Sequence, residues 1–147
     1  MYRKIMVATD GSTLSKKAVT TAIGMAQLCG ADLVAVKVVP RFIQSYFEGS
    51  IPLGANEVKR IEAQWSQDGQ KILDAVSKMA TAKGVKVKTM VVKSDQVADA
   101  LVATATKSKT DLIVMASHGR SGIKRLLLGS ETQHVLAQAK IPVLVLR

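Results

Sequence analysis

The sequence predicts an open α/β fold, in which a parallel β-sheet is covered by helices on both faces. Five short apolar runs alternate along the chain with segments in which apolar residues recur every three or four positions. Most of these runs are nearly continuous and rich in valine, which is typical of strands buried on both faces. Successive strand–helix–strand units form right-handed crossovers and a parallel sheet. With 48% hydrophobic residues, residues 1–147 are expected to form a single domain.

The five predicted strands differ in how they are bounded and patterned. The first ends at the turn signal Asp10-Gly11-Ser12, and the second ends at Pro40. Lysine occupies alternate positions in the first half of the third run, which predicts an edge strand whose charges oppose further pairing. The strands are expected at residues 4–9, 32–39, 85–92, 111–116 and 142–146.

Four helices are predicted between these strands from the spacing of apolar residues. The first covers residues 14–29 and is followed by Gly30, a suitable C-cap. The second covers residues 58–79 and is followed by Gly84, and the third and fourth are expected at 97–105 and 132–139. Residues 41–55 break the pattern and hold three of the five aromatic residues. This segment is either a flap packed on the second helix, the interpretation that we favour, or a partner-contact surface or nucleotide lid.

Composition excludes several classes of protein. No apolar stretch approaches the ~18 residues of a membrane span, and Asp10 interrupts the N-terminal run, so neither a membrane span nor a targeting segment is expected. The single cysteine, Cys29, excludes an internal disulfide and is expected to be a buried, unreactive thiol. A reducing compartment fits this cysteine usage, and we expect a cytoplasmic protein.

The net charge of +10 comes from 21 lysines and arginines against 11 acidic residues, and it attracts anions of any kind. Aromatic residues make up only 3% of the chain, which leaves few platforms for stacking bases of a single strand. Specific nucleic-acid recognition is therefore not expected. Binding driven by charge alone would depend steeply on salt.

Several catalytic and metal-binding motifs are missing from the sequence. His118 and His134 are the only histidines, and neither has a partner at metal-ligand spacing, so no metal ligand is assigned. The nucleophile pattern Gly-x-Ser-x-Gly, the dinucleotide pattern Gly-x-Gly-x-x-Gly and the Walker pattern do not occur. No catalytic residue is assigned, and hydrolysis of a nucleotide is expected to be weak at most.

Function is expected at the carboxyl ends of the strands, where the winding of a doubly wound sheet reverses. Two loops reach this position: residues 10–12 after the first strand, and Ser117 onward after the fourth. Residues 116–132 read ASHGRSGIKRLLLGSET. Glycines in this loop allow close backbone approach to a ligand, and Ser130 is predicted to be the N-cap of the last helix.

These residues predict a phosphate site. Free amides and the positive dipole end at a helix start attract anions, and the hydroxyls of Ser130 and Thr132 are potential donors. Arg120, Lys124 and Arg125 supply positive charge between the glycines. The alternative is that the glycines serve turns alone and that the helix start has no ligand. We favour phosphate binding, because the cations lie in a loop at the end of a central strand.

Three segments of the chain, KIMVATDGS at residues 4–12, DLIVMASHGRSGIKRLLLGS at residues 111–130 and IPVLVLR at residues 141–147, resemble the universal stress protein family. Its nucleotide-binding branch carries glycine, two residues, glycine, nine residues, then glycine followed by serine or threonine. Gly119, Gly129 and Ser130 match the later part of this pattern, and Ala116 stands at its first glycine. The fold expected is a flavodoxin-like, doubly wound, five-stranded parallel sheet in the order 3-2-1-4-5, with helices on both faces.

The resemblance also implies contacts for individual residues. Asp10 stands where the family places an acid near the adenosine, and Val38 stands where the backbone meets the adenine. From the residues alone, Asp10 has two equally favoured structural roles, in starting the turn or in capping the first helix. The residues expected to bind the nucleotide are Ala8, Thr9, Asp10, Val38, Met115, Ala116, Gly119, Arg120, Gly129, Ser130, Glu131 and Thr132.

The expected function is binding of ATP or a related adenine nucleotide, accompanied by Mg²⁺, by a stress-response sensor or regulator. The apolar terminal strand Val143–Leu146 and the resemblance together imply a homodimer, in which this strand pairs with its copy. Two alternatives remain open. One is a family member that has lost nucleotide binding and acts through dimer and protein contacts, to which Ala116 points; the other is a slow ATPase.

Overall fold

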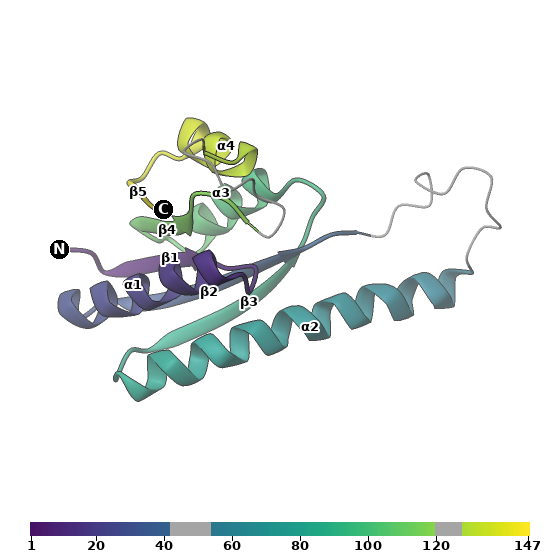
Figure 1. Cartoon of the computed structure of the whole chain (residues 1–147), viewed down its shortest axis with the longest axis horizontal. Coiled ribbons are helices and arrows are strands. Elements are labelled where there is room, and N and C mark those ends of the chain that lie inside the picture. The colour runs from purple at the N-terminus through teal and green to yellow at the C-terminus, as the bar shows by residue number, and fades with distance from the viewer. Residues whose placement is uncertain (42–53, 120–127) are drawn as a thin grey trace.

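The computed structural model describes residues 1–41, 54–119 and 128–147. Strands and helices alternate through these residues in the predicted order (Figure 1). The strands are β1 (Lys4–Ala8), β2 (Asp32–Val39), β3 (Val87–Lys93), β4 (Leu112–Ala116) and β5 (Val143–Leu146). The helices are α1 (Thr13–Cys29), α2 (Ala55–Ala82), α3 (Val97–Lys107) and α4 (Ser130–Gln138).

The strands form one parallel sheet in the order β3-β2-β1-β4-β5, which confirms the predicted order. The central strand β1 pairs with β2 in a register that runs from Lys4 opposite Asp32 to Ala8 opposite Val36. On its other side β1 pairs with β4. The winding reverses between β1 and β4, so a crevice is expected at the carboxyl ends of these two strands. The sheet shares the doubly wound architecture of flavodoxin, although the strands of flavodoxin itself have the order 2-1-3-4-5.

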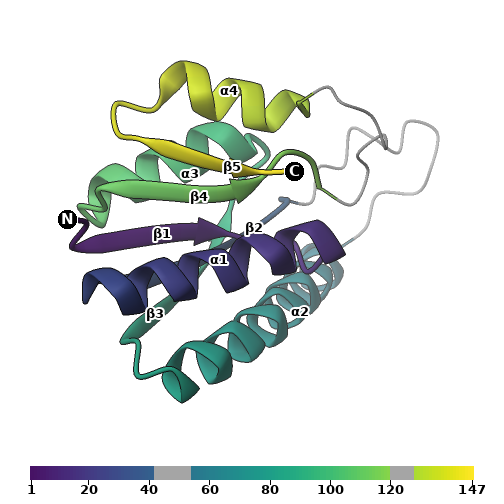
Figure 2. The ribbon, with the colours of Figure 1, turned by 60° about the vertical axis from the view of Figure 1, so that its left-hand side comes forward.

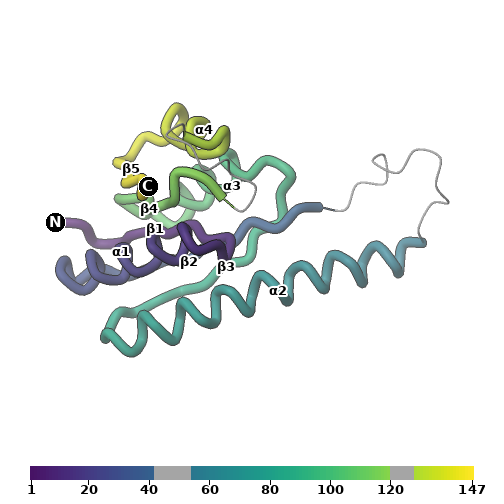
Figure 3. Tube along the Cα trace, in the orientation of Figure 1, coloured from purple at the N-terminus to yellow at the C-terminus, as the bar shows by residue number. Residues whose placement is uncertain are grey.

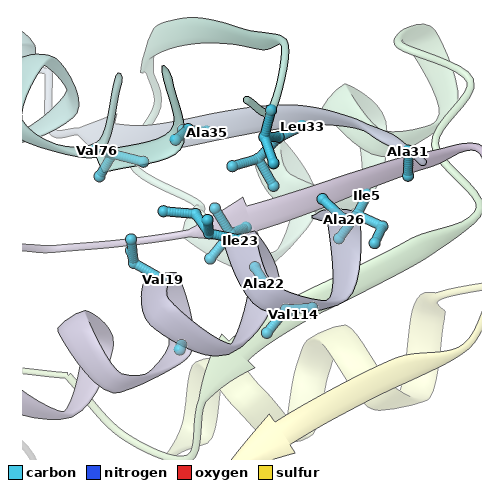
Figure 4. Close-up of a cluster of buried hydrophobic side chains, with 14 of the residues drawn as sticks. Ile5, Val19, Ala22, Ile23, Ala26, Ala31, Leu33, Ala35, Val76 and Val114 are labelled. Carbon is cyan, nitrogen blue, oxygen red and sulfur yellow. The ribbon is translucent and has the colours of Figure 1, made fainter. Parts of the chain in front are cut away.

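Helices cover both faces of the sheet (Figure 2). Helices α1 and α2 pack on one face, over a buried cluster that includes Ile5 and Val7 of β1. Figure 4 shows part of this cluster, with Ile23 of α1 beside the strands. Helices α3 and α4 pack on the other face, over a second cluster that includes Met6. Successive residues of a central strand therefore serve opposite cores, which explains why the strands are almost continuously apolar.

Local signals at the helix ends agree with the position of α1. The N-cap of α1 is Ser12, whose hydroxyl oxygen accepts from the amide of Ser15 at 3.2 Å. Its C-cap is Gly30 with φ 65°, as predicted. Helix α2 has 28 residues and is longer than expected. At 1.5 Å per residue it measures about 42 Å, and it extends past the carboxyl edge of the sheet (Figure 3).

The structure corrects several details of the prediction. Strand β3 begins at Val87 rather than at residue 85, because the amide of Val85 donates to Ala80 O and so still belongs to the end of α2. The strand does lie at an edge of the sheet, as predicted. Cys29 is half-buried rather than buried. Most of the expected flap, residues 42–53, lies outside the described residues. Across the described parts of the chain, no helix combines the length and apolarity needed to cross a membrane.

Candidate functional site

A cavity opens at the carboxyl edge of the sheet, where β1 and β4 are followed by loops. Its volume is about 920 Å³, within the range of small-molecule sites. The views in Figures 1 and 2 place the start of α4 at this same edge. Arg120 lies outside the described residues, and the other predicted binding residues all line the cavity. These are Ala8, Thr9, Asp10, Val38, Met115, Ala116, Gly119, Gly129, Ser130, Glu131 and Thr132.

The loop between β1 and α1 is held by its own polar side chains. The hydroxyls of Thr9 and Ser15 lie 3.1 Å apart, and the amide of Gly11 donates to Thr9 Oγ1 at 3.2 Å. Oδ1 of Asp10 accepts from the amide of Ser12 at 2.9 Å, while Ser12 itself caps α1. Of its two expected structural roles, Asp10 therefore takes the one in the turn. The turn presents this carboxylate at the cavity.

The loop after β4 approaches Asp10 closely at Gly119. A Cβ atom built on Gly119 would lie 2.5 Å from Oδ2 of Asp10, which is closer than real Cβ contacts. The φ angle of Gly119 is not in the left-handed region, so the glycine is required here by space. The two loops at the reversal point of the sheet thus meet through an aspartate and a glycine.

The first turn of α4 differs from the prediction in one respect. The N-cap is Gly129, and Ser130 is the first helical residue rather than the cap. The amide of Gly129 donates to Ser117 O at 2.8 Å, and Gly129 O accepts the first helical bond from Gln133 at 3.0 Å. No side chain of the described residues caps this helix start. The amides of residues 130–132 have no carbonyl of their own helix to donate to, so the helix start offers donors to the cavity.

Thr132 and Glu131 are engaged in contacts with other elements. The hydroxyl of Thr132 is buried and lies 3.0 Å from both Ala116 O and Ser117 O, to which it donates. It therefore anchors α4 to the end of β4. Oε2 of Glu131 accepts from the amide of Ala98 at 3.0 Å and so caps α3 from outside that helix. Both side chains stabilise the cavity wall that they also line.

The edge of β2 that faces the cavity extends beyond the end of β1. The amide of Thr9 donates to Val36 O at 3.0 Å, and β1 ends beside this residue. Main-chain groups of alternate residues in a strand point to the same side, so those of Val38 point past the end of β1. Val38 lines the cavity with this edge.

Sequence reasoning missed the wall of the cavity that α2 provides. This wall contains Trp65, the only tryptophan of the chain, and Gly69, whose lack of a side chain lets α2 approach β2. A Cβ on Gly69 would lie 3.2 Å from Lys37 Cγ and from Val39 Cγ1. A glycine inside a long predicted helix was the available signal, because it is unfavourable there unless close packing requires it. The lining residues that were not predicted include Lys37, Trp65, Asp68, Gly69, Ile72, Val97 and Leu101.

No group of three or more histidine, cysteine or acidic residues within the described ranges is placed to hold a metal ion. Single carboxylates do line the cavity, at Asp10, Asp68 and Glu131. Mg²⁺ is usually bound through one or two carboxylates together with substrate phosphates and water. The residues therefore fit a Mg²⁺ ion that arrives with a phosphate ligand better than one held by the protein alone.

Comparisons with known proteins agree on one family. The profile of the universal stress protein family matches residues 1–147. The universal stress protein MJ0531 of Methanocaldococcus jannaschii is 38% identical over 149 residues, which cover 100% of this chain and 83% of the relative. The solved structure of MJ0577, a protein of the same organism, has a TM-score of 0.84 and 25% identity and covers 99% of this chain and 96% of its own. A universal stress protein solved in complex with cAMP has a TM-score of 0.68 and 28% identity, covering 99% and 97%.

Proposed function

Because the chain belongs to the universal stress protein family, we propose that it binds ATP or a related adenine nucleotide and acts as a stress-response sensor or regulator. The nucleotide occupies the cavity at the carboxyl edge of the sheet. The relative that was solved with cAMP supports an adenine nucleotide as the class of ligand. The proposal assigns no general base, and a slow ATPase is its alternative.

The observation that carries this proposal is the start of α4, which no side chain of the described residues caps, at the wall of a cavity large enough for a nucleotide. Amides of residues 130–132 point along the helix toward the cavity, and the helix dipole adds a partial positive charge there. Gly129 and Gly119 let the main chain pack closely at this wall of the cavity, since a Cβ at either position would meet Ser117 O or Asp10 Oδ2. Such a helix start is a general site for phosphate groups.

In this arrangement the adenine lies between the ends of β1 and β2. The main-chain amide of Val38 offers a donor to the edge of the base, and Val38 O, which also accepts from Lys37 Nζ at 2.9 Å, offers its second acceptor site. The side chains of Val38, Met115 and Leu101 supply apolar contact for its faces. Mg²⁺ accompanies the phosphates and neutralises part of their charge.

A homodimer is part of the same proposal. Strand β5 is an outer strand of the sheet and pairs with β4 alone within the described residues. Its second edge is available for pairing with the β5 strand of another copy across a two-fold axis. Helix α4 packs over the cluster to which Val143 and Val145 of β5 contribute. On this helix the apolar side chain of Leu136 remains 41% exposed.

A thermal-shift titration with ATP and Mg²⁺ tests the nucleotide proposal. A ligand at one hundred times its Kd stabilises the folded state by about 2.7 kcal/mol. For a domain of this size that energy raises Tm by roughly 5–10 °C. No shift at millimolar ATP would contradict nucleotide binding and favour the alternative of a protein that acts through partner contacts.

Two glycine variants make this test specific for the start of α4. Gly129 and Gly54 are both N-cap residues, with φ −63° and ψ 156° against φ −65° and ψ 156°. A Cβ on Gly129 would lie 3.2 Å from Ser117 O, whereas nothing lies within 4 Å of a Cβ on Gly54. We expect Gly129→Val to lose most of the ATP-dependent shift and Gly54→Val to keep it. Phosphate release that survives Gly129→Val would come from a contaminant.

A further inference from the structure

His118 lies just after β4 and lines the cavity beside the start of α4. A Cβ placed on Gly129, the N-cap of that helix, would lie 3.4 Å from both Cα and Cβ of His118. The side chain of His118 therefore starts next to the helix end whose amides have no partner in their own helix. This placement brings an ionisable ring to the proposed phosphate site.

The imidazole ring of His118 is tethered through one of its two nitrogens. Nδ1 lies 3.1 Å from the hydroxyl oxygen of Ser117. Ser117 is buried, its amide donates to Leu146 O at 2.7 Å, and its carbonyl accepts from the amide of Gly129 at 2.8 Å. A hydroxyl both donates and accepts, so it is a suitable partner for the neutral and for the protonated ring. The tether thus orients the ring without fixing its charge.

The second ring nitrogen, Nε2, is on the far side of the ring from this tether. Within the described residues, the ring of His118 makes its hydrogen bond through Nδ1 alone. In this part of the chain, Ser66 Oγ is the buried side-chain polar atom that lacks a partner, and Nε2 of His118 is not such an atom. Nε2 is therefore accessible to solvent or to a ligand. Both nitrogens of a protonated imidazole donate, so Nε2 is able to donate to a phosphate oxygen while Nδ1 keeps its contact with Ser117.

The other charged groups around His118 are carboxylates and cations of ordinary types. Among the described residues, the ionisable side chains that line the cavity with it are Asp10 after β1, Lys37 on β2, Asp68 on α2 and Glu131 on α4. At the end of β5, Lys17 Nζ of α1 donates to Arg147 O at 3.0 Å, which adds two further cations. Carboxyl and ammonium groups ordinarily change charge below about pH 5 and above about pH 9, whereas histidine does so between about pH 5 and 8. Within the described wall, His118 is therefore the group expected to respond near neutral pH.

We propose that His118 links nucleotide binding to protons, because its protonated ring donates from Nε2 to a phosphate oxygen at the start of α4. The proposal rests on the proposed function, since it assumes a phosphate group at this helix start. Negative phosphate oxygens favour the protonated ring over the neutral one. Binding therefore takes up a proton, and the affinity for the nucleotide rises as the pH falls through the range in which histidine titrates.

Titration calorimetry of the full chain with ATP and saturating Mg²⁺ tests this linkage. A hydrogen bond to a charged group changes affinity by about ten- to hundredfold, and the half-buried ring of His118 is expected at the lower end. We expect the wild type to bind ATP about tenfold more tightly at about pH 6 than at about pH 8. Titrations near neutral pH in buffers of different ionisation enthalpy give the number of protons taken up, which should be a clear fraction of one.

Two variants assign the effect to a single histidine. The side chain of His118→Gln carries a neutral donor and does not titrate, so this variant should bind ATP at about pH 8 much as the wild type does and gain little on acidification. His134→Gln replaces the other histidine of the chain, at an exposed position of α4, and is the matched control. It should keep the wild-type pH profile and proton uptake. Protonation of ATP itself is common to the three proteins and cancels in the comparison.

NMR of the wild type provides a second measurement that does not depend on the His118 variant. The two histidine ring signals are assigned from the loss of one of them in His134→Gln. ATP with Mg²⁺ should move the protonation midpoint of the His118 ring to higher pH and leave that of His134 unchanged.

The outcomes separate the inference from the function on which it rests. A wild-type protein that binds no ATP overturns both. Binding of ATP with the same pH dependence in the wild type and in His118→Gln overturns the inference alone. A midpoint of the His118 ring that ATP lowers or leaves unchanged also overturns it, whether or not the variant folds.

Discussion

A methyl group on Gly119 would lie 2.5 Å from Oδ2 and 3.7 Å from Cγ of Asp10. The carboxylate has little freedom to move away, because its Oδ1 accepts from the amide of Ser12 at 2.9 Å. We therefore expect Gly119→Ala to lower the free energy of unfolding by about 1–3 kcal/mol, the usual cost of overpacking. Urea denaturation of the protein without nucleotide measures the change.

The same contact can be tested from its other side. In an Asp10→Ala background the obstacle is gone, so at least half of the loss caused by Gly119→Ala should disappear. Gly24→Ala provides the control for glycine replacement, since nothing lies within 4 Å of a Cβ there and the residue is inside α1. It should be stabilising by about 0.5–1 kcal/mol. Equal losses from Gly119→Ala in both backgrounds would contradict the steric explanation.

At the scale of elements, Glu131 couples α4 to α3. Helix α3 has no side-chain cap from its own N-cap residue, Gln96, and its first-turn amide at Ala98 donates instead to Oε2 of Glu131 at 3.0 Å. Removing an N-terminal capping acceptor typically costs about 1 kcal/mol. We expect Glu131→Ala to lower the free energy of unfolding by about this amount and to speed hydrogen exchange at the amide of Ala98.

Glu131→Gln is the matched variant for this prediction. Its amide oxygen is able to accept from Ala98, so it should recover more than half of the loss, although it gives up the favourable charge in the first turn of α4. Native-state hydrogen exchange followed by NMR reports the protection of this single amide. If Glu131 served the ligand alone, neither variant would change the stability of the nucleotide-free protein.

The accuracy of the sequence prediction also depends on the element. The bounds predicted for β2 agree with the structure at both ends, because Pro40 and the preceding turn mark them locally. The start of β3 was misplaced, because Val85 is apolar yet donates to Ala80 O at the end of α2. Whether an apolar residue closes a helix or opens a strand depends on a hydrogen bond that periodicity does not encode.

The candidate site shows the same division between local and tertiary information. Residues in the loops after β1 and β4 were predicted because the reversal point of a doubly wound sheet follows from topology. The contributions of Lys37 and Gly69 were missed, because they depend on how closely α2 lies over β2. The interhelix cap formed by Glu131 was likewise unpredictable, since it joins residues 33 positions apart.

At the scale of the whole molecule, the proposed dimer depends on which main-chain groups of β5 are already paired. Pro142 O accepts from Ile113 at 3.0 Å and Leu146 O accepts from Ser117 at 2.7 Å, so the even-numbered residues face β4. Main-chain groups of Val143 and Val145 therefore point away from the sheet. These are the groups that a second copy would use.

Proline at either of two neighbouring positions distinguishes the two edges of this strand. Val145→Pro removes an outward amide and leaves the bonds to β4 intact, so we expect a folded monomer with stability close to that of the wild-type subunit. Leu144→Pro removes an inward amide, leaves a carbonyl of β4 without its donor, and should lower the free energy of unfolding by about 1–3 kcal/mol.

Light scattering coupled to gel filtration gives the masses, and the wild type should have twice the 15.7 kDa mass of one chain. A wild type that is monomeric at all concentrations, or a Val145→Pro variant that remains dimeric, would exclude pairing of β5 with its copy, because that pairing needs the outward amides of this strand.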